Sequence, residues 1–216
     1  RRWMLDPSTC KDFNFTVGLG LKLPTGQDNA TDTFQIFQNG AVTTAVRTVD
    51  QSIQPGDGGF GFVLDVAGFK RFAKNRVAVY AAAAYLFNPE TTNGVQTYRG
   101  RASEAEMSIA DQYLVALGAS VAVPWVDGLS VGLGGRWEGV PPDDAFGSSE
   151  GFRRPGYSIG IDPSISYGWA GSSVFASVPF ALYRNRLVSV PDRADNTHGD
   201  AAFAPWVLFV GYSHRF

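Results

Sequence analysis

The last eleven residues of the chain, from Trp206 to Phe216, carry its strongest structural signal. Successive side chains of an extended strand point to opposite faces. One face holds Trp206, Leu208, Val210, Tyr212, His214 and Phe216, and the other holds Val207, Phe209, Gly211, Ser213 and Arg215. A tilted strand of about this length spans the hydrocarbon core of a bilayer. Alternation by itself fits any half-buried strand, so the rest of the chain must decide the setting.

Composition excludes membrane-spanning helices and favours strands. Hydrophobic residues make up 44% of the 216 residues and the mean hydropathy is −0.06, yet no apolar run reaches the roughly 18 residues that a membrane helix needs. The 25 Gly, 16 Phe and 8 Tyr favour β structure. Alternating strands dilute the hydropathy signal, so strand spans stay open.

Seven further stretches alternate in the same way, and the connections between them follow a rule. The expected strands are 13–23, 59–69, 76–87, 113–123, 129–137, 157–169, 174–183 and 206–216. Their connections read long, short, long, short, long, short, long. A closed antiparallel barrel of the outer membrane, with long loops outside and short turns inside, has this order. We therefore predict one all-β domain over 1–216, an antiparallel transmembrane up-and-down β-barrel of the bacterial outer membrane. The alternatives are a lipocalin-like soluble barrel and a β-sandwich.

Aromatic residues give an independent indication. The alternation of long and short connections, called here loop parity, fixes the strand directions. One group of aromatic residues then falls near the outer strand ends: Phe60, Phe62, Phe87, Tyr113, Trp137, Tyr157 and Trp206. A second group falls near the inner ends: Phe13, Phe15, Trp125, Tyr167, Trp169, Tyr212 and Phe216. Two aromatic girdles at the two interfaces are typical of transmembrane barrels.

Parity also bears on the N-terminal residues. The strand at 13–23 runs outward, so 6–12 is expected to be a periplasmic turn and 1–5 the tail of an earlier inward strand. Because barrels of this kind have an even number of strands, the full-length protein would then have 10–12 strands, and the chain would be its C-terminal part. The alternative is an ordered periplasmic arm on an eight-stranded barrel.

Six charged side chains fall on the face predicted to line the lumen: Lys22, Asp65, Arg136, Glu138, Asp162 and Arg215. Such charges can form a constriction that selects solutes. They can equally pair with one another because buried charges in a filled barrel must be satisfied. The many Gly, Ala and Ser residues of this face either leave room for a solute or pack tightly. Both interpretations stay open.

Other functions find little support. An enzyme would need an activated Ser or His, and only His198, beside Asp200, and His214 are available, without a nucleophile-elbow serine. The acidic stretches 55–59 and 141–144 lack calcium-loop spacing and are explained by turn chemistry. Cys10 is a single cysteine, which excludes a disulfide within the chain. A net charge of −2 without a basic stripe does not favour nucleic acid. We expect no catalytic site, metal or cofactor.

Several short stretches together resemble a known family. They are Gly18-Leu-Gly-Leu-Lys-Leu-Pro-Thr-Gly26, Gln51-Ser-Ile-Gln-Pro-Gly-Asp-Gly-Gly59, Phe152-Arg-Arg-Pro-Gly-Tyr157, the loop 197–200 and the terminal strand ending in Phe216. The chain is similar to the family named for the MetA pathway of phenol degradation, whose members are outer-membrane barrels often described as transporters.

The resemblance implies an outer-membrane channel for small compounds, among them hydrophobic or aromatic ones, akin to the long-chain fatty-acid channels. It also implies three kinds of partner: outer-membrane lipid and lipopolysaccharide, the barrel-assembly machinery acting on the Phe216 strand, and a small hydrophobic solute. The alternative function is a structural or partner-binding barrel with a closed lumen, acting through its long extracellular loops.

Overall fold

The computed structural model describes residues 1–6, 8–74, 76–199 and 203–214. Its strands are β1 (Arg2–Trp3), β2 (Phe13–Lys22), β3 (Thr31–Gln38), β4 (Ala41–Thr48), β5 (Gly61–Phe72), β6 (Val77–Phe87), β7 (Thr92–Gln96), β8 (Glu106–Ser108), β9 (Gln112–Ala122), β10 (Leu129–Val140), β11 (Gly156–Trp169), β12 (Ser172–Ser177), β13 (Phe180–Arg186) and β14 (Phe209–His214). The helical segments are η1 (Gln51–Ile53), η2 (Ala102–Glu104) and α1 (Val190–Ala194). None of the helical segments in these ranges is long and apolar enough to cross a membrane.

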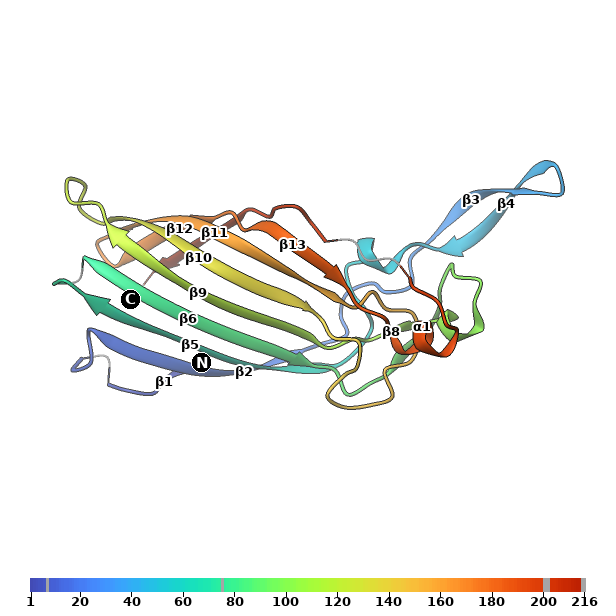
Figure 1. Ribbon diagram of the computed structural model, residues 1–216, viewed down its shortest axis with the longest axis horizontal. Coiled ribbons are helices and arrows are strands. Elements are labelled where there is room, and N and C mark those ends of the chain that lie inside the picture. The colour runs from blue at the N-terminus through green and yellow to red at the C-terminus, as the bar shows by residue number, and fades with distance from the viewer. Residues whose placement is uncertain (7, 75, 200–202, 215–216) are drawn as a thin grey trace.

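One antiparallel sheet forms the body of the molecule (Figure 1). Its strand order is β1-β2-β5-β6-β9-β10-β11-β12-β14, and β13 pairs with β11. The predicted all-β class and up-and-down order are confirmed, and the first six predicted strands are each found as a single strand within three residues of the expected bounds. The short connections gather at one end of the sheet, called here the turn end, and the long ones at the other, called the loop end (Figure 1).

The strand predicted at 174–183 is wrong as a single strand. It is divided into β12 and β13, which pair with opposite halves of β11, and the register of β11 with β13 shifts between Ile159 and Gly160. Pro179 lies in the break, where proline has no N–H to donate to a ladder. The last strand begins later than expected, because only an isolated bridge between Trp206 and Phe180 precedes β14. Residues 215–216 of the predicted strand lie outside the described residues.

The two faces of the sheet differ in polarity. One face, called the apolar face, exposes large hydrophobic side chains along the strands: Leu19, Leu21, Leu64, Val66, Val115, Leu117, Val131, Leu133, Ile159, Ile161, Val210 and Tyr212. The other, called the polar face, carries mainly Gly, Ala, Ser and Thr with few charges. The alternation predicted from the sequence thus separates the two faces of one sheet.

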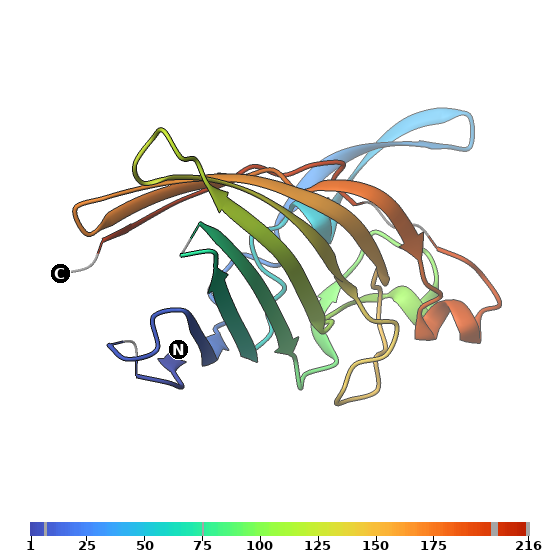
Figure 2. The ribbon, with the colours of Figure 1, turned by 60° about the vertical axis from the view of Figure 1, so that its left-hand side comes forward.

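The sheet is curled (Figure 2), and a contact between two side chains places its polar face on the inside. The guanidinium carbon of Arg136 in β10 lies 5.2 Å from the ring centroid of Phe209 in β14. These strands are separated by β11 and β12, and neighbouring strands lie about 4.8 Å apart. Side chains on strands this distant meet only across a concave surface.

In the described ranges the sheet is a half-barrel whose two edges are β1 and β14. Arg2 pairs with Val17 and Trp3 with Thr16, so residues 2–3 form a strand beside β2, as the interpretation of 1–5 as a strand tail predicts. Closure of the sheet into a barrel stays a prediction.

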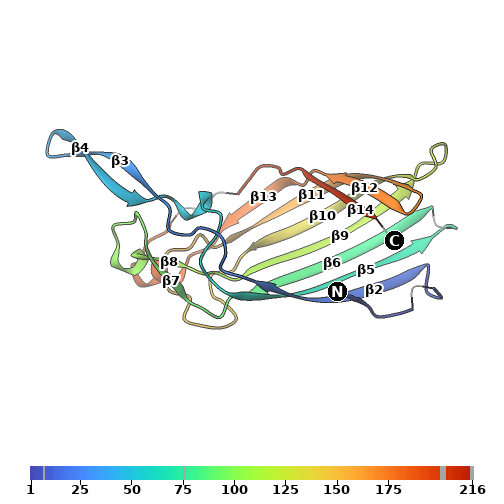
Figure 3. The same ribbon diagram turned by 180° about the vertical axis from the view of Figure 1, so that it is seen from behind.

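The long connections contain more structure than predicted. Residues 27–58, expected to be a polar loop, contain the hairpin of β3 and β4, which projects away from the sheet at the loop end (Figures 1 and 3). Alternation in 31–38 is weak because polar and apolar residues are mixed on both faces of an exposed ribbon. The second long connection contains one helical turn, η2, and the fourth contains the short helix α1.

Candidate functional site

Five of the six charged residues predicted to line the lumen belong to the described part of the chain, and all five lie on the polar face. Most of them form separate ion pairs and do not gather in one cluster. Lys22 Nζ lies 2.6 Å from Asp57 Oδ2, and Asp65 Oδ1 lies 2.5 Å from Arg1 Nε. Among these described charges, only Arg136 and Glu138 pair with each other. Asp162 belongs to the same face through its register with Gly134. Arg215 lies outside the described residues.

The buried hydrophobic core of the described chain lies in its loops. Met107, Ile109 and Phe152 are its buried hydrophobic residues, and all three belong to connections at the loop end. We call residues 49–59, 88–111, 141–155 and 187–199 the loop cap. Its segments come from all four long connections, so the cap holds together parts of the chain that are far apart in sequence.

A buried arginine ties two of these segments together. Arg153 is 2% exposed, and its guanidinium lies 2.5 Å from Asp144 Oδ2 and donates to Ser108 Oγ at 2.6 Å. Both side chains of the ion pair are 1% exposed. Asp144 also accepts from the backbone N–H of Asp111 at 2.8 Å, so the carboxylate is well satisfied. Breaking one partner of such a pair leaves an uncompensated buried charge.

The next residue joins a third connection to these two. Arg154 donates to both carboxylate oxygens of Asp50, at 2.8 and 2.7 Å, and the Tyr98 hydroxyl donates to the same carboxylate at 2.8 Å. Burial of Asp50 favours its protonated form, but these bonds and the Ser52 N–H outweigh burial and hold the pKa of Asp50 well below its usual range. The carboxylate is therefore charged at neutral pH.

A third cluster fixes α1 to η2. Asp192 accepts from Arg101 and Arg186, each at 3.3 Å, and forms a capping box with Ser189 at the start of α1. Burial raises the pKa of Asp192, but the hydrogen bonds from Ser189 and Arg101 exceed that effect and lower it below its ordinary value. Arg101 also lies 2.6 Å from Glu104 Oε1.

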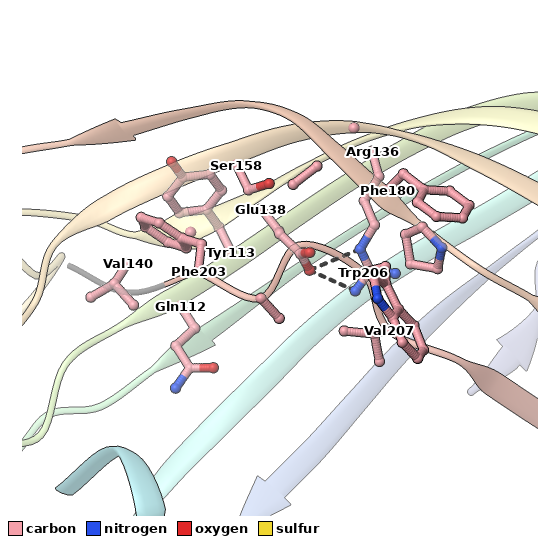
Figure 4. Close-up of a pocket in the computed structure, with 15 residues that line it drawn as sticks. Gln112, Tyr113, Arg136, Glu138, Val140, Ser158, Phe180, Phe203, Trp206 and Val207 are labelled. Carbon is pink, nitrogen blue, oxygen red and sulfur yellow. Dashed lines mark hydrogen bonds and ion pairs between the residues drawn. The ribbon is translucent and has the colours of Figure 1, made fainter. Parts of the chain in front are cut away.

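A cavity of about 220 Å³ opens on the polar face just below the loop cap (Figure 4). We call it the wall cavity. Arg136, Glu138 and Ser158 are among the polar residues that line it, and Phe180, Phe203 and Trp206 are among the apolar ones. Arg136 donates to Glu138 Oε2 from Nε at 2.8 Å and from Nη2 at 2.6 Å. Because both bonds end on one oxygen, the other can accept from a bound solute.

A second cavity, of about 360 Å³, lies within the loop cap and is called here the cap cavity. Asp57, Met107, Arg153 and Arg154 are among the residues that line it. Three residues line both cavities: Gln112, Val140 and Phe203. The two cavities therefore lie next to each other, one among the loops and one against the sheet.

The histidines considered for catalysis line neither of the two cavities. His198 Nδ1 contacts the carbonyl oxygen of the adjacent Gly199 at 3.2 Å, and Asp200 lies outside the described residues. His214 Nδ1 lies 2.8 Å from Ser172 Oγ at the turn end. In the part of the chain that the structure describes, no group of three or more His, Cys, Asp or Glu could hold a metal ion.

The acidic stretches considered for calcium are engaged within the protein. Asp57 pairs with Lys22 and accepts from the Gly59 N–H at 3.1 Å. Asp144 is neutralised by Arg153. These contacts agree with the turn interpretation of both stretches.

The residues that sequence reasoning missed are those of the loop cap. The adjacent Arg153 and Arg154 were noticed only as part of a family-like stretch, and Phe203 was placed in a loop without a role. Two consecutive arginines in a chain with few charges were the available signal. Their partners, Asp144 and Asp50, could not be assigned because nothing local pairs them.

A scan against protein-family models finds no match to this chain, and a search of curated proteins finds none either. The resemblance to the MetA-pathway family therefore stays a prediction.

Proposed function

We propose that this protein is a β-barrel of the bacterial outer membrane that passes small compounds, including hydrophobic or aromatic ones, across that membrane. The observation that carries the proposal is the apolar face. Leu19, Leu117 and Val210 are 80%, 65% and 68% exposed, and similar residues continue across the curled sheet. A soluble monomer rarely exposes so large a contiguous apolar surface. The hydrocarbon core of a lipid bilayer is the environment in which such an apolar surface is stable.

The proposal assigns the two faces different environments. The apolar face contacts lipid and, in the outer leaflet, lipopolysaccharide. The polar face lines a lumen, with the loop cap on the extracellular side. Open sheet edges do not persist in hydrocarbon, because their N–H and C=O groups have no partners there. The proposal therefore requires the edges at β1 and β14 to be paired, either with each other or with further strands. The strand that ends at Phe216 presents the signal for barrel assembly.

Transport is tested with the full-length protein in liposomes. The swelling rate in solutions of arabinose, glucose and benzenesulfonate reports passage of small polar and aromatic solutes. We expect rates above those of protein-free liposomes for at least one of these solutes. A properly inserted protein that admits none of them, and gives no conductance in planar bilayers, would refute a channel.

A second function is favoured by the projecting hairpin. Phe37, Val42 and Val46 lie on one face of the β3–β4 ribbon and are 75%, 64% and 69% exposed. A two-stranded hairpin by itself is marginally stable in water. Contact with a partner would bury these exposed side chains and stabilise the hairpin. The function would then be binding of an extracellular partner through the loops.

A deletion separates the two functions. The Val49 N–H donates to the Ala30 carbonyl at 3.0 Å, so these residues can be joined by a Gly-Gly link in place of 31–48 without displacing the cap. If the hairpin binds a partner, the deletion abolishes capture of that partner from the cell surface and leaves liposome flux unchanged. Capture that survives the deletion would reject the hairpin as the binding element.

A further inference from the structure

The wall cavity and the cap cavity lie in series along the axis of the sheet. Gln112 begins β9 and Val140 ends β10, so both lie where the sheet passes into the loop cap. Phe203 reaches the same level from the connection that follows α1. Each of the three lines the wall cavity (Figure 4) and also the cap cavity. Together they form the partition between a chamber among the loops and a chamber on the sheet wall.

Phe203 is the bulkiest member of the partition, and the backbone beneath it is glycine. A Cβ built on Gly156 would lie 2.9 Å from Phe203 Cζ and 3.1 Å from Cε2, which is closer than side chains pack. The ring therefore lies directly against the start of β11. Any larger residue at position 156 would displace the ring, so Gly156 and Phe203 define its position together.

The chambers differ in what surrounds a solute. The cap cavity is bordered by charged groups, among them Asp57, Arg153 and Arg154. The wall cavity offers aromatic surfaces and one neutralised pair, Arg136 with Glu138. Its volume of about 220 Å³ compares with the roughly 150 Å³ of an engineered cavity that holds benzene. Its size is therefore suited to a solute of one ring.

We propose that Phe203 is the size-selecting residue of the path, and that it admits single-ring solutes from the cap cavity to the wall cavity while excluding larger ones. The inference rests on the proposed transport function. It goes beyond that function because it locates the selective step at one side chain on a loop, and not at the charged residues of the polar face.

Liposome swelling with the full-length protein tests the selectivity. Arabinose and glucose are the single-ring probes and sucrose is the two-ring probe. In the native protein we expect single-ring flux and little sucrose flux. Phe203→Ala is expected to raise the ratio of sucrose to arabinose flux by about fivefold, because removing the ring widens the constriction. Phe203→Trp is expected to lower glucose flux. Phe146→Ala, at an exposed loop phenylalanine that lines neither cavity, is the matched control and should change neither.

Chemical accessibility gives a second readout that needs no flux. Ser158→Cys, in a Cys10→Ser background, places a thiol in the wall cavity. A membrane-impermeant methanethiosulfonate applied from outside should label it slowly in the native partition and several-fold faster with Phe203→Ala. Ser148→Cys, on an exposed loop, should label at the same rate in both.

The outcomes separate the two proposals. If no solute passes through the native protein, the transport function fails, and the labelling rates still decide whether Phe203 separates the chambers. If the native protein transports, but Phe203→Ala changes neither the sucrose ratio nor the labelling rate of the thiol at position 158, the size-selecting role of Phe203 is refuted and transport stands.

Discussion

At the scale of single residues, neighbouring positions in the same loop have very different energetic weight. Asp143 and Asp144 each pair with an arginine, Arg193 and Arg153 respectively. The first pair is half exposed, with side chains 48% and 57% accessible, and the second is almost completely buried. Exposed pairs contribute little because water and salt screen them, whereas a buried charge that loses its partner is strongly destabilising.

Arg153→Met is therefore expected to lower the free energy of opening of the loop cap by about 3–5 kcal/mol, because Asp144 would remain buried without a countercharge. Amide hydrogen exchange of residues 106–111 and 143–153, with the protein in micelles, measures this loss. Arg193→Met is the matched control, with an expected loss below about 1 kcal/mol. Equal losses in the two variants would contradict the assigned difference in burial.

The polar face has its own residue-scale constraint at Tyr80. A Cβ on Gly118 or Gly134 would clash with the Tyr80 ring or hydroxyl. The ring of Tyr80 in β6 therefore extends over Gly118 in β9 and over Gly134, its partner in β10. Gly134→Val is expected to push the ring into the lumen and to reduce conductance. Gly134→Val combined with Tyr80→Ala should restore it. A single variant with native conductance would show that the ring does not limit the path.

At the scale of elements, alternation decides what each strand can tolerate. Ala82 and Ala83 are adjacent at the centre of β6 and point to opposite faces, Ala82 toward the polar face beside Ala67 and Ala116, and Ala83 outward beside Val66 and Val115. Since the two residues are identical in type and depth, they compare the two environments with little else changed.

Ala83→Arg is expected to destabilise the protein in lipid by about 2–4 kcal/mol, the cost of an arginine at the bilayer midplane of a barrel. Ala82→Arg should cost much less, because the polar face accepts a hydrated charge. Urea titration in phospholipid vesicles, followed by tryptophan fluorescence, measures both. If the two variants are equally stable, the apolar face does not contact lipid.

At the scale of the whole molecule, the curled sheet and the loop cap are held by different forces. The sheet depends on backbone ladders and on its apolar face, whereas the cap depends on ion pairs that join all four long connections. Asp50 and Asp192 are central to those pairs, and each has a pKa below its ordinary value. The cap should therefore respond to acid before the sheet does.

The sign follows from linkage. A carboxylate whose pKa is lower in the folded state stabilises that state fully above its unfolded pKa of about 3.9, and the contribution is lost as the pH falls below that value. We expect a closed cap at pH 7 and pH 5, a cap that weakens progressively below about pH 4, and an open cap only when the pH falls through the lowered pKa values of Asp50 and Asp192. The distance between spin labels at positions 96 and 194, in a Cys10→Ser background, measures the opening. Asp192→Asn should open the cap at pH 7, and opening already at pH 5 would contradict the assignment.

The sequence by itself determined the strands and their faces. Alternation in 13–23 and 157–169 is local, with a period of two, and loop parity fixed the strand order, so the all-β antiparallel sheet followed from neighbours in sequence. It also placed Lys22, Asp65, Arg136, Glu138 and Asp162 on one face. The prediction of one strand at 174–183 was wrong, because the apolar residues on both sides of Pro179 read as one continuous strand although the hydrogen-bond ladder is interrupted there.

Only the tertiary structure decided which side chains meet. The pairs Arg154–Asp50 and Arg153–Asp144, and the position of Phe203 against Gly156, join segments that carry no local pattern. A charge in a loop can be neutralised by any partner that the fold brings near, and periodicity contains no information on that choice. Strand pairing is determined by alternation along the chain. The loop cap, the cap cavity and the wall cavity are determined by contacts between segments that are far apart in the sequence.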